Sequence, residues 1–239
     1  MRKRLAVVVF AALGIALFLA LGTWQVQRRA WKLDLIARVE QRVHAAPVAA
    51  PAFAEWPELH GADQEYRHVR VSGIYIASAQ ALVQAVTERG PGHWLLMPLR
   101  QGDGSVVWIN RGFVPLNWRA GGDTPSAPVN VDGLLRLTEP GGGFLRRNDA
   151  ATERWFSRDV QALSAARGLT RTAPFFIDAD AAPQPAPNDP VGGLTVIAFH
   201  NSHLIYAITW YTLALMVAAA AYYVMRVERR SGNADAAQH

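Results

Sequence analysis

HNSHLIYAITWY, residues 200–211, opens an apolar run that continues without a charged residue to Met225. From Leu204 the run is about 22 residues long, so as a helix rising about 1.5 Å per residue it can cross a hydrocarbon core of roughly 30 Å. The stretch therefore predicts a transmembrane helix over residues 204–225, with two histidines just before its amino-terminal end.

One face of this predicted helix carries an imidazole and a large aromatic ring. His203 and Trp210 are two helical turns apart and share that face with Ala207 and Ala214. Small side chains between two rings suit a flat hydrophobic ligand, and ionisable groups within membrane helices are often functional. Amphipathic rings also gather at membrane boundaries without any ligand. Position alone leaves both interpretations open.

A second candidate span lies at the amino terminus, where Met1-Arg2-Lys3-Arg4 precedes an uncharged stretch from Leu5 to Thr23. A cleaved signal peptide is the competing interpretation, because residues 20–22 resemble a small-x-small cleavage site. However, the apolar run exceeds the usual core of about 7–15 residues. The helical pattern also continues through Trp31 and Val39. We therefore predict one uncleaved helix over residues 5–44, with its second half amphipathic and outside the bilayer.

Charge and composition set the expected orientation and class. The net charge is +5, but the basic residues are scattered or flank the two spans, which indicates membrane topology rather than nucleic-acid binding. Basic flanks at both ends place both termini in the cytoplasm and the intervening domain outside it. The absence of an Arg- and Ser-rich presequence favours a bacterial inner membrane, with a periplasmic domain, over a mitochondrial one. The sequence has no cysteine, which excludes disulfides and thiolate chemistry.

The segment between the spans changes from helical to alternating periodicity. Residues 46–58 are rich in Ala and Pro and are typical of a linker. One short helix is expected over residues 158–167, capped by Ser157 and followed by Gly168. An antiparallel, mostly β domain of the α+β class is therefore predicted over residues 60–199. Its expected strands are 66–71 (continued or bulged at 74–76), 81–87, 93–99, 105–110, 129–137, 174–178 and 194–199.

A catalytic site is not visible in this domain, so the chain is not expected to be an enzyme. The sequence contains no Gly-x-Ser-x-Gly elbow, and residues 141–143 lack the Lys-Ser or Lys-Thr pair of a phosphate-binding loop. His200 and His203 without a nearby carboxylate are a weak metal signal. Several acids and arginines lie close together and are interpreted as a solvated, salt-bridged surface; they are Arg146, Arg147, Asp149, Glu153, Arg154, Arg158 and Asp159.

Three motifs in order resemble the Surfeit locus protein 1 family, the assembly factors of cytochrome c oxidase. Residues 22–28, GTWQVQR, followed by Lys32, are similar to the family's Gly-x-Trp-Gln-x-x-Arg and trailing Lys. Residues 110–115, NRGFVP, resemble Asn-Arg-Gly-Trp-Val-Pro, with Phe113 in place of Trp. Residues 201–210, NSHLIYAITW, resemble Asn-Asn-His-Leu-x-Tyr-Ala-x-Thr-Trp, with Ser202 in place of the second Asn.

The resemblance implies that the chain binds haem a or delivers it to subunit I of the oxidase, with subunit I and haem a synthase as partners. His203 matches the family's proposed ligand of the haem iron. Trp210 on the same face and Trp24 at the end of the first span would complete the haem pocket, whereas His200 is as consistent with an interface residue. The alternative is a membrane scaffold that holds oxidase subunits and never binds haem.

Overall fold

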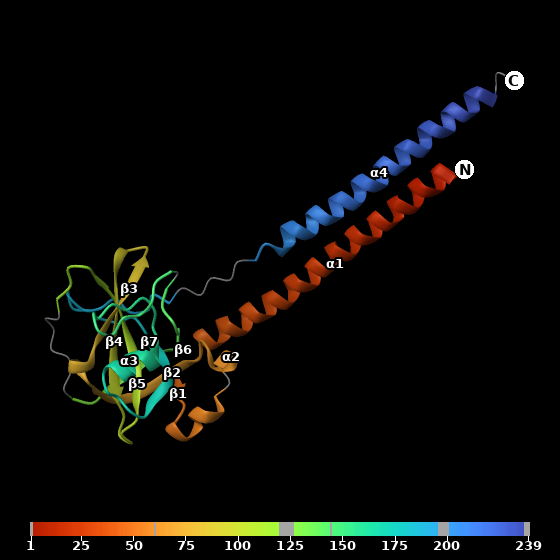
Figure 1. The fold of residues 1–239 in the computed structure, drawn as a ribbon. Helices are drawn as coiled ribbons and strands as arrows, with labels where there is room; N and C mark the ends of the chain where they lie inside the picture. Colours follow the sequence, from red (N-terminus) through yellow and green to blue (C-terminus); the bar gives the residue numbers. More distant parts are fainter. Residues whose placement is uncertain (1, 60, 120–126, 144, 196–200, 237–239) are drawn as a thin grey trace. The chain divides into compact units, whose positions relative to one another are not determined.

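The computed structural model describes residues 2–59, 61–119, 127–143, 145–195 and 201–236 (Figure 1). The chain forms two compact units. One consists of Met1–Arg38 together with Ala198–His239, and the other is Val39–Ile197. The first unit is helical, and the second contains the sheet.

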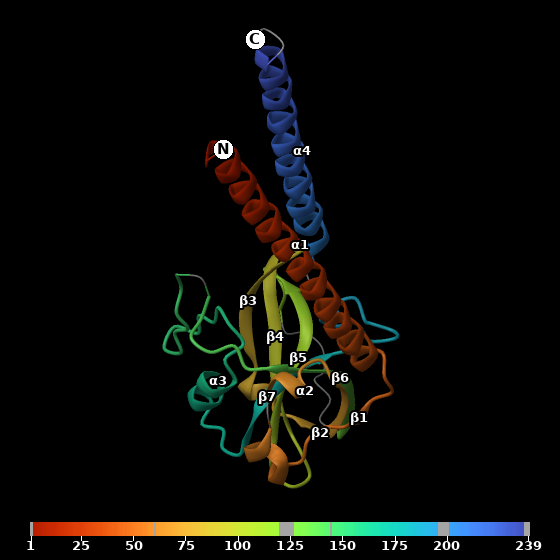
Figure 2. The same ribbon diagram turned by 90° about the vertical axis from the view of Figure 1, so that its right-hand side faces the viewer.

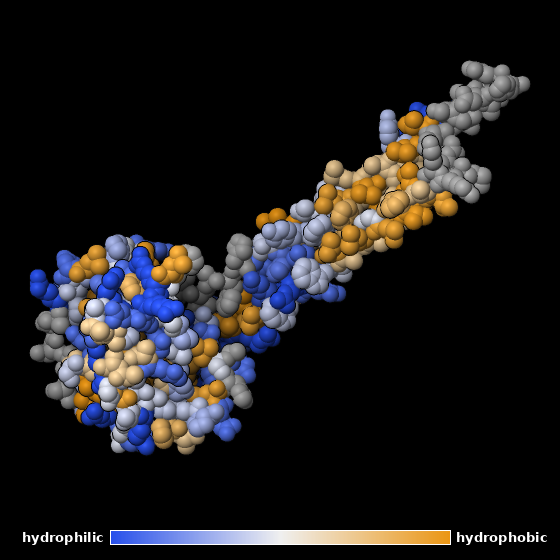
Figure 3. Space-filling model, viewed as in Figure 1, coloured by the Kyte–Doolittle hydropathy of each residue, from blue (hydrophilic) through white to orange (hydrophobic). Residues whose placement is uncertain are grey.

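Two long helices make up the first unit. Helix α1 (Arg2–Val43) and helix α4 (His203–Ala236) run antiparallel beside each other (Figures 1 and 2). By length and composition, Leu5–Val43 and His203–Val227 are both suited to cross a membrane. Figure 3 shows hydrophobic residues over the two helices short of their grey ends, while the second half of α1 is hydrophilic. This pattern fits two apolar spans, one of which continues as an amphipathic helix.

A seven-stranded sheet forms the second unit, in the order β1-β2-β6-β7-β5-β4-β3 (Figure 2). The end of β2 also pairs with β4, through Ile74 with Arg100 and Tyr75 with Leu99. The strands are β1 (Val48–Ala49), β2 (His68–Tyr75), β3 (Ala81–Thr87), β4 (Gly90–Arg100), β5 (Val106–Pro115), β6 (Val129–Leu137) and β7 (Thr172–Ala179). β3 and β6 begin and end at the residues predicted for them.

The expectation of a wholly antiparallel sheet was wrong. Strand β7 lies between β5 and β6, which run in opposite directions, so it must be parallel to one of them; it is parallel to β5. The short strand β1 is likewise parallel to β2. Leu194 and Thr195 of the expected last strand are outside any strand, and its residues 196–199 lie outside the described residues.

Several short elements were also missed. The predicted linker over residues 46–58 contains β1 and the 3-10 helix η1 (Phe53–Glu58). It is ordered because Trp56 is buried edge-on against Phe175, with ring centroids 6.1 Å apart, and its indole N–H donates to the carbonyl of Pro51. Two further short elements are the helix α2 (Gly61–Gln64) and the 3-10 helix η2 (Ala77–Ala79).

Helix α3 (Val160–Ala166) is the predicted short helix, but its cap differs from the expected one. The Oδ1 of Asp159 accepts a hydrogen bond from the amide of Ala162 at 3.0 Å, whereas the hydroxyl of Ser157 accepts one from Asn148. A carboxylate at this position also interacts favourably with the helix dipole. Asp159 therefore replaces Ser157 as the residue that starts the helix.

Both faces of the central strands are buried, which explains their continuous apolar sequences. In β5, Val107 and Ile109 pack into one hydrophobic cluster with Phe175 and Ile177. The intervening Trp108 packs into another cluster, which includes Leu163 of α3. The indole N–H of Trp108 donates to the hydroxyl of Ser164 at 2.9 Å, so α3 is fixed to this face of the sheet by both packing and a buried hydrogen bond.

Candidate functional site

The two long helices meet along a face of small and aromatic side chains. The rings of Phe18 and Trp210 are stacked, with centroids 5.7 Å apart and an interplanar angle of 22°. One turn further along α1, Gly22 lies against the ring of Tyr211, so closely that an added Cβ would be 2.7 Å from that ring. Glycine at this position therefore allows the two helices to approach each other.

His203 lies at the first turn of α4 and is bonded to α1. Its Nδ1 is 2.7 Å from Oε1 of Gln25, a buried amide. Because the amide oxygen only accepts, Nδ1 is the donor of this bond, and in the neutral tautomer with a proton on Nδ1 the lone pair lies on Nε2. Nε2 makes no hydrogen bond with a described residue, so the ring is oriented by one nitrogen and the other remains available to bind.

The face that was predicted to hold a flat ligand is partly filled by α1. Ala207 and Ala214 are 2% and 4% exposed, and Trp210 stacks on Phe18. His203, Ala207, Trp210 and Ala214 thus share a face as predicted, but that face packs against a helix. A planar ligand therefore cannot lie over the two alanines. The part of the predicted site that remains for a ligand is Nε2 of His203 and its surroundings.

Trp24 and His200, the other two residues of the sequence hypothesis, are placed differently. Trp24 is 54% exposed, and none of the described contacts joins its ring to His203 or Trp210. Its neighbour Gln25, not Trp24, contacts His203. His200 lies outside the described residues. Gln25 was quoted in a motif but not singled out; the signal was its three-residue spacing from Gly22, which places the amide on the face turned toward α4.

A second polar group at the start of α4 lacks a partner. The side-chain oxygen of Asn201 is buried and accepts no hydrogen bond from a described residue. Buried amide oxygens are normally paired, so such an atom calls for an explanation. Together with Nε2 of His203 it places two unsatisfied acceptors within three residues.

The motif at residues 110–113 holds the segment that leads toward α4 in the sequence. The amide of Asn110 donates to Oδ1 of Asp178 at 2.7 Å and its oxygen accepts from the backbone N–H of Gly112 at 3.1 Å. Phe113 exchanges two backbone hydrogen bonds with Val191, each 2.9 Å long. Gly112 has φ +125°, and a Cβ there would collide with the carbonyl of Val191. Only glycine fits this crossing.

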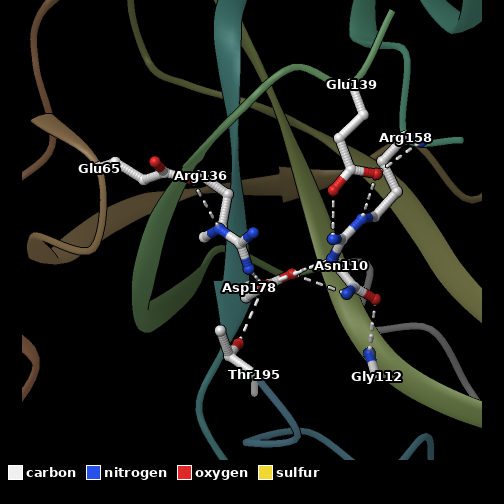
Figure 4. Close-up of polar contacts among 8 residues, drawn as sticks. All are labelled: Glu65, Asn110, Gly112, Arg136, Glu139, Arg158, Asp178 and Thr195. Atoms are coloured by element: carbon white, nitrogen blue, oxygen red, sulfur yellow. Dashed lines mark hydrogen bonds and ion pairs between the residues drawn. The ribbon is translucent and has the colours of Figure 1, made fainter. Parts of the chain in front are cut away.

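Asp178 is the centre of a buried charge cluster (Figure 4). Arg136 and Arg158 donate to its carboxylate at 3.0 Å and 3.2 Å, and the hydroxyl of Thr195 donates at 2.9 Å. Asp178 itself is 5% exposed. The cluster therefore ties residues 191–195 to strands β5, β6 and β7. Its members are Glu65, Asn110, Gly112, Arg136, Glu139, Arg158, Asp178 and Thr195.

The two arginines of the cluster have further carboxylate partners. Glu139 accepts from Nε of Arg158 at 3.1 Å, and Glu65 lies 3.5 Å from Nε of Arg136. Burial acts to raise the pKa of Glu139, but the bonds from Arg158 outweigh it and hold that pKa below its ordinary value. The arginine charges are thus matched by carboxylates, and the cluster is suited to hold structure together rather than to catalyse. Among the described residues, no three His, Asp or Glu side chains gather as a metal site.

His68 joins the linker after α1 to the segment after β7. Its Nδ1 is 2.7 Å from the carbonyl of Ala45, and its Nε2 is 2.8 Å from the carboxylate of Asp180. Both partners are acceptors, so only the protonated ring satisfies both. Burial opposes protonation, but the bond to Ala45 and the bond and charge of Asp180 outweigh it, as does the charge of Asp132, and raise the pKa of His68 above 6.5.

We expect the stabilisation from His68 to depend on pH. Because its folded-state pKa is raised, the contribution is fully present below about pH 6.5 and is lost as the pH rises through the folded-state value. The unfolding midpoints of the wild type and of His68→Gln should therefore converge between about pH 5 and about pH 9. A substitution of His93 is the control: because burial lowers the pKa of His93, its effect on the unfolding midpoint should change with pH in the opposite direction. A pH-independent difference for His68→Gln would contradict this assignment.

Comparison with known proteins finds a family model and several relatives that match most of the chain. A family model described as "SURF1 family" matches residues 12–215. Surfeit locus protein 1 of Rattus norvegicus is 35% identical over 214 residues, covering 81% of this chain and 67% of that protein. The Homo sapiens protein of the same name is 34% identical, covering 81% and 69%. A SURF1-like protein of Monosiga brevicollis is 32% identical over 89% and 84% of the two chains.

Proposed function

The chain belongs to the SURF1 family, and on that basis we propose that it is a membrane-anchored assembly factor of cytochrome c oxidase that binds haem a and delivers it to subunit I. Subunit I and haem a synthase are its proposed partners. The proposal has two parts, a role in oxidase assembly and a haem-binding site, and they rest on different observations. Family membership supports the first, and the geometry around His203 supports the second.

The bond between Gln25 and His203 is the observation that carries the haem proposal. Histidines that bind metals commonly donate their second ring N–H to an acceptor, which fixes the tautomer and the ring orientation and raises the basicity of the ligand. The amide of Gln25 does this for Nδ1 at 2.7 Å and leaves Nε2 with its lone pair free. The site thus has the donor set that a haem iron takes from a protein.

The surroundings of His203 suit an apolar ring system. Leu204, Ile205 and Ile208 are 48%, 68% and 58% exposed on the first turns of α4, so the helix that carries His203 has exposed apolar surface at this end. When bound, haem a would supply an iron, and Nε2 of His203 would hold it as a ligand. In this proposal Trp210 acts by holding α4 against Phe18, and the exposed ring of Trp24 is available to contact the ligand.

The proposed location is a bacterial inner membrane, with both termini in the cytoplasm and residues 60–199 in the periplasm. The two apolar helices support membrane anchoring, and their flanking arginines and lysines support the orientation. With His203 at the beginning of the second apolar helix, the ligand site would lie at the membrane boundary. A haem soluble in lipid would then reach Nε2 without leaving the bilayer completely.

The test is a haem a titration of the purified full chain in detergent, followed by absorbance. We expect a bound-haem spectrum for the wild type and none for His203→Ala. His44→Ala is the matched control, because His44 is an exposed histidine directly after α1 whose bonds with described residues all go to Glu40, and it should bind haem a like the wild type. An unchanged spectrum for His203→Ala would remove this residue as the ligand.

The scaffold alternative predicts a different result in cells. If the chain holds oxidase subunits without touching haem, a strain that carries His203→Ala would assemble oxidase with normal haem a content. The haem-binding proposal predicts reduced haem a in the oxidase at an unchanged level of the His203→Ala protein. Measuring the pyridine haemochrome of isolated membranes separates the two.

A further inference from the structure

We propose that the arginine cleft, a cavity of about 770 Å³ between strand β3 and the loop of residues 146–156, binds an extended acidic segment of a partner protein. The proposal goes beyond haem binding, because the cleft lies entirely within the Val39–Ile197 unit and shares no residue with the His203 site. Its lining includes Gln84, His93, Arg146, Arg147, Arg154 and Phe156.

The loop that carries the arginines is built rigidly from its own hydrogen bonds. The side-chain oxygen of Asn148 accepts from the backbone N–H groups of Phe156 and Ser157 at 2.8 Å and 3.2 Å. Asp149 and Arg154 exchange two backbone hydrogen bonds of 2.9 Å. Trp155 is 2% exposed and anchors the loop in the core. The loop therefore presents its charged side chains from a fixed backbone.

Three guanidinium groups of this loop make no direct ion pair with a described residue, although the charge of Arg154 acts on the nearby carboxylate of Asp149. Arg146, Arg147 and Arg154 are exposed, and no carboxylate of a described residue lies within ion-pair distance of them. Arg146 and Arg154 lie over the ring of Phe156, 5.4 Å and 5.5 Å from its centroid. Arg146 also donates to the side-chain oxygen of Gln84 at 2.8 Å, which holds it beside β3. The expected salt-bridged surface is thus absent at these three residues.

The carboxylates in the cleft are already engaged elsewhere. Asp149 accepts from the hydroxyl of Thr152 at 2.8 Å and from two amides of its own turn, and these bonds, together with the charge of Arg154, lower its pKa. Glu153 binds both terminal nitrogens of Arg167, at 2.7 Å and 2.6 Å, which lowers its pKa as well. Burial lowers the pKa of His93, so it adds no charge at neutral pH. Among the described residues the three arginines therefore have no ion-pair partner, while both carboxylates already accept hydrogen bonds from other groups.

Trp155 covers the outer edge of β3 at Val83 and Gln84, and among the described residues that edge is open at Val86, which favours an extended peptide over a small anion. β3 pairs with β4 on one side only. On its other side, Gln84 donates its backbone N–H to Trp155 at 2.8 Å, and strand alternation points the N–H of Val86 the same way. Val86 is 83% exposed. Its partner on β4 is Pro91, which has no backbone N–H. No described backbone group pairs with the outer edge of Val86.

Edge and charge together define the ligand. An exposed edge accepts a further strand through backbone hydrogen bonds, and the side chains of that strand set specificity. In an extended peptide every second side chain points the same way, about 7 Å apart, so alternating acids can reach successive arginines. A free phosphate or a lipid headgroup would use the arginines but gain nothing from the edge at Val86.

The test uses the full chain in neutral phosphatidylcholine nanodiscs without haem. The probe is a fluorescein-labelled heptapeptide in which glutamate alternates with threonine, and binding is followed by fluorescence polarisation. We expect the triple change Arg146→Gln, Arg147→Gln and Arg154→Gln to weaken binding about tenfold or more. Arg100→Gln is the matched control and should have no effect, because Arg100 is an exposed arginine at the opposite end of β4.

A second pair of variants tests the strand edge. Val86→Pro removes the outward N–H without removing a bond to β4 and should weaken binding several-fold, whereas Val86→Thr should not. A control peptide in which lysine replaces each glutamate should not bind. If it bound as tightly as the glutamate peptide, or if the triple arginine variant bound the glutamate peptide as tightly as the wild type, the proposal would be overturned. Displacement of the peptide by an equal concentration of inorganic phosphate would overturn the proposal in favour of a small anion. Binding of phosphatidylglycerol vesicles that depends on the three arginines, without binding of the peptide, would overturn it in favour of a lipid.

Discussion

Replacing Asp178 by alanine is expected to destabilise the Val39–Ile197 unit by about 3–5 kcal/mol, because two arginines lose the carboxylate they share in a buried site. Asp178 is 5% exposed, and the side chains of Arg136 and Arg158 are each 14% exposed. Removing the anion leaves both cations with one carboxylate each and also frees the amide of Asn110 and the hydroxyl of Thr195. For a unit of this size the loss corresponds to a fall in the unfolding midpoint of roughly 10 °C.

The measurement is thermal unfolding of the full chain in detergent, followed by tryptophan fluorescence. Asp63→Ala is the control, because Asp63 is exposed and makes no side-chain bond with a described residue; it should unfold like the wild type. The double change Asp178→Ala with Arg136→Leu should be less destabilising than the sum of the single changes, since it removes an uncompensated charge together with its partner. A midpoint for Asp178→Ala equal to that of the wild type would show that water already screens this cluster.

The second large effect is expected at Gln25, on ligand binding rather than on folding. Gln25→Leu removes the acceptor at 2.7 Å from Nδ1 of His203 and so releases the tautomer and orientation of the ring. Changes to such supporting partners of metal ligands commonly cost about 10- to 100-fold in affinity. We therefore expect the haem a affinity of Gln25→Leu to fall by that factor, with helix content unchanged.

Two further variants distinguish positioning from a general effect on α1. Gln25→Glu keeps an oxygen acceptor and should retain binding, while Gln27→Leu, at an exposed glutamine two residues away, should bind like the wild type. Nitrogen NMR of the haem-free protein gives an independent readout, because Nδ1 of His203 should be the protonated ring nitrogen in the wild type. Wild-type affinity in Gln25→Leu would show that His203 is oriented by something other than this amide.

Periodicity and turn chemistry made most of the elements predictable. The uncharged runs from Leu5 and from Leu204 predicted the two long helices, and the short Val- and Leu-containing runs predicted β3 and β6 with their observed ends. These signals are local, because one face of a helix or strand must be apolar wherever the element packs. By contrast, β7 is parallel to β5 because it inserts between β5 and β6, which precede it in the chain. The residues of β7 themselves carry no pattern that specifies this position in the sheet.

The sequence of HNSHLIYAITWY by itself determined that an apolar helix begins beside a histidine, since hydrophobicity and helical spacing are properties of consecutive residues. Only the tertiary structure decided what that histidine touches. The Gln25–His203 bond joins residues 178 positions apart, and the stacking of Phe18 on Trp210 closes the face that looked open in the sequence. Pairing over such separations depends on how two helices pack, which single-chain periodicity does not encode. For the same reason Arg158, which the sequence grouped with surface arginines, is instead a partly buried partner of Asp178.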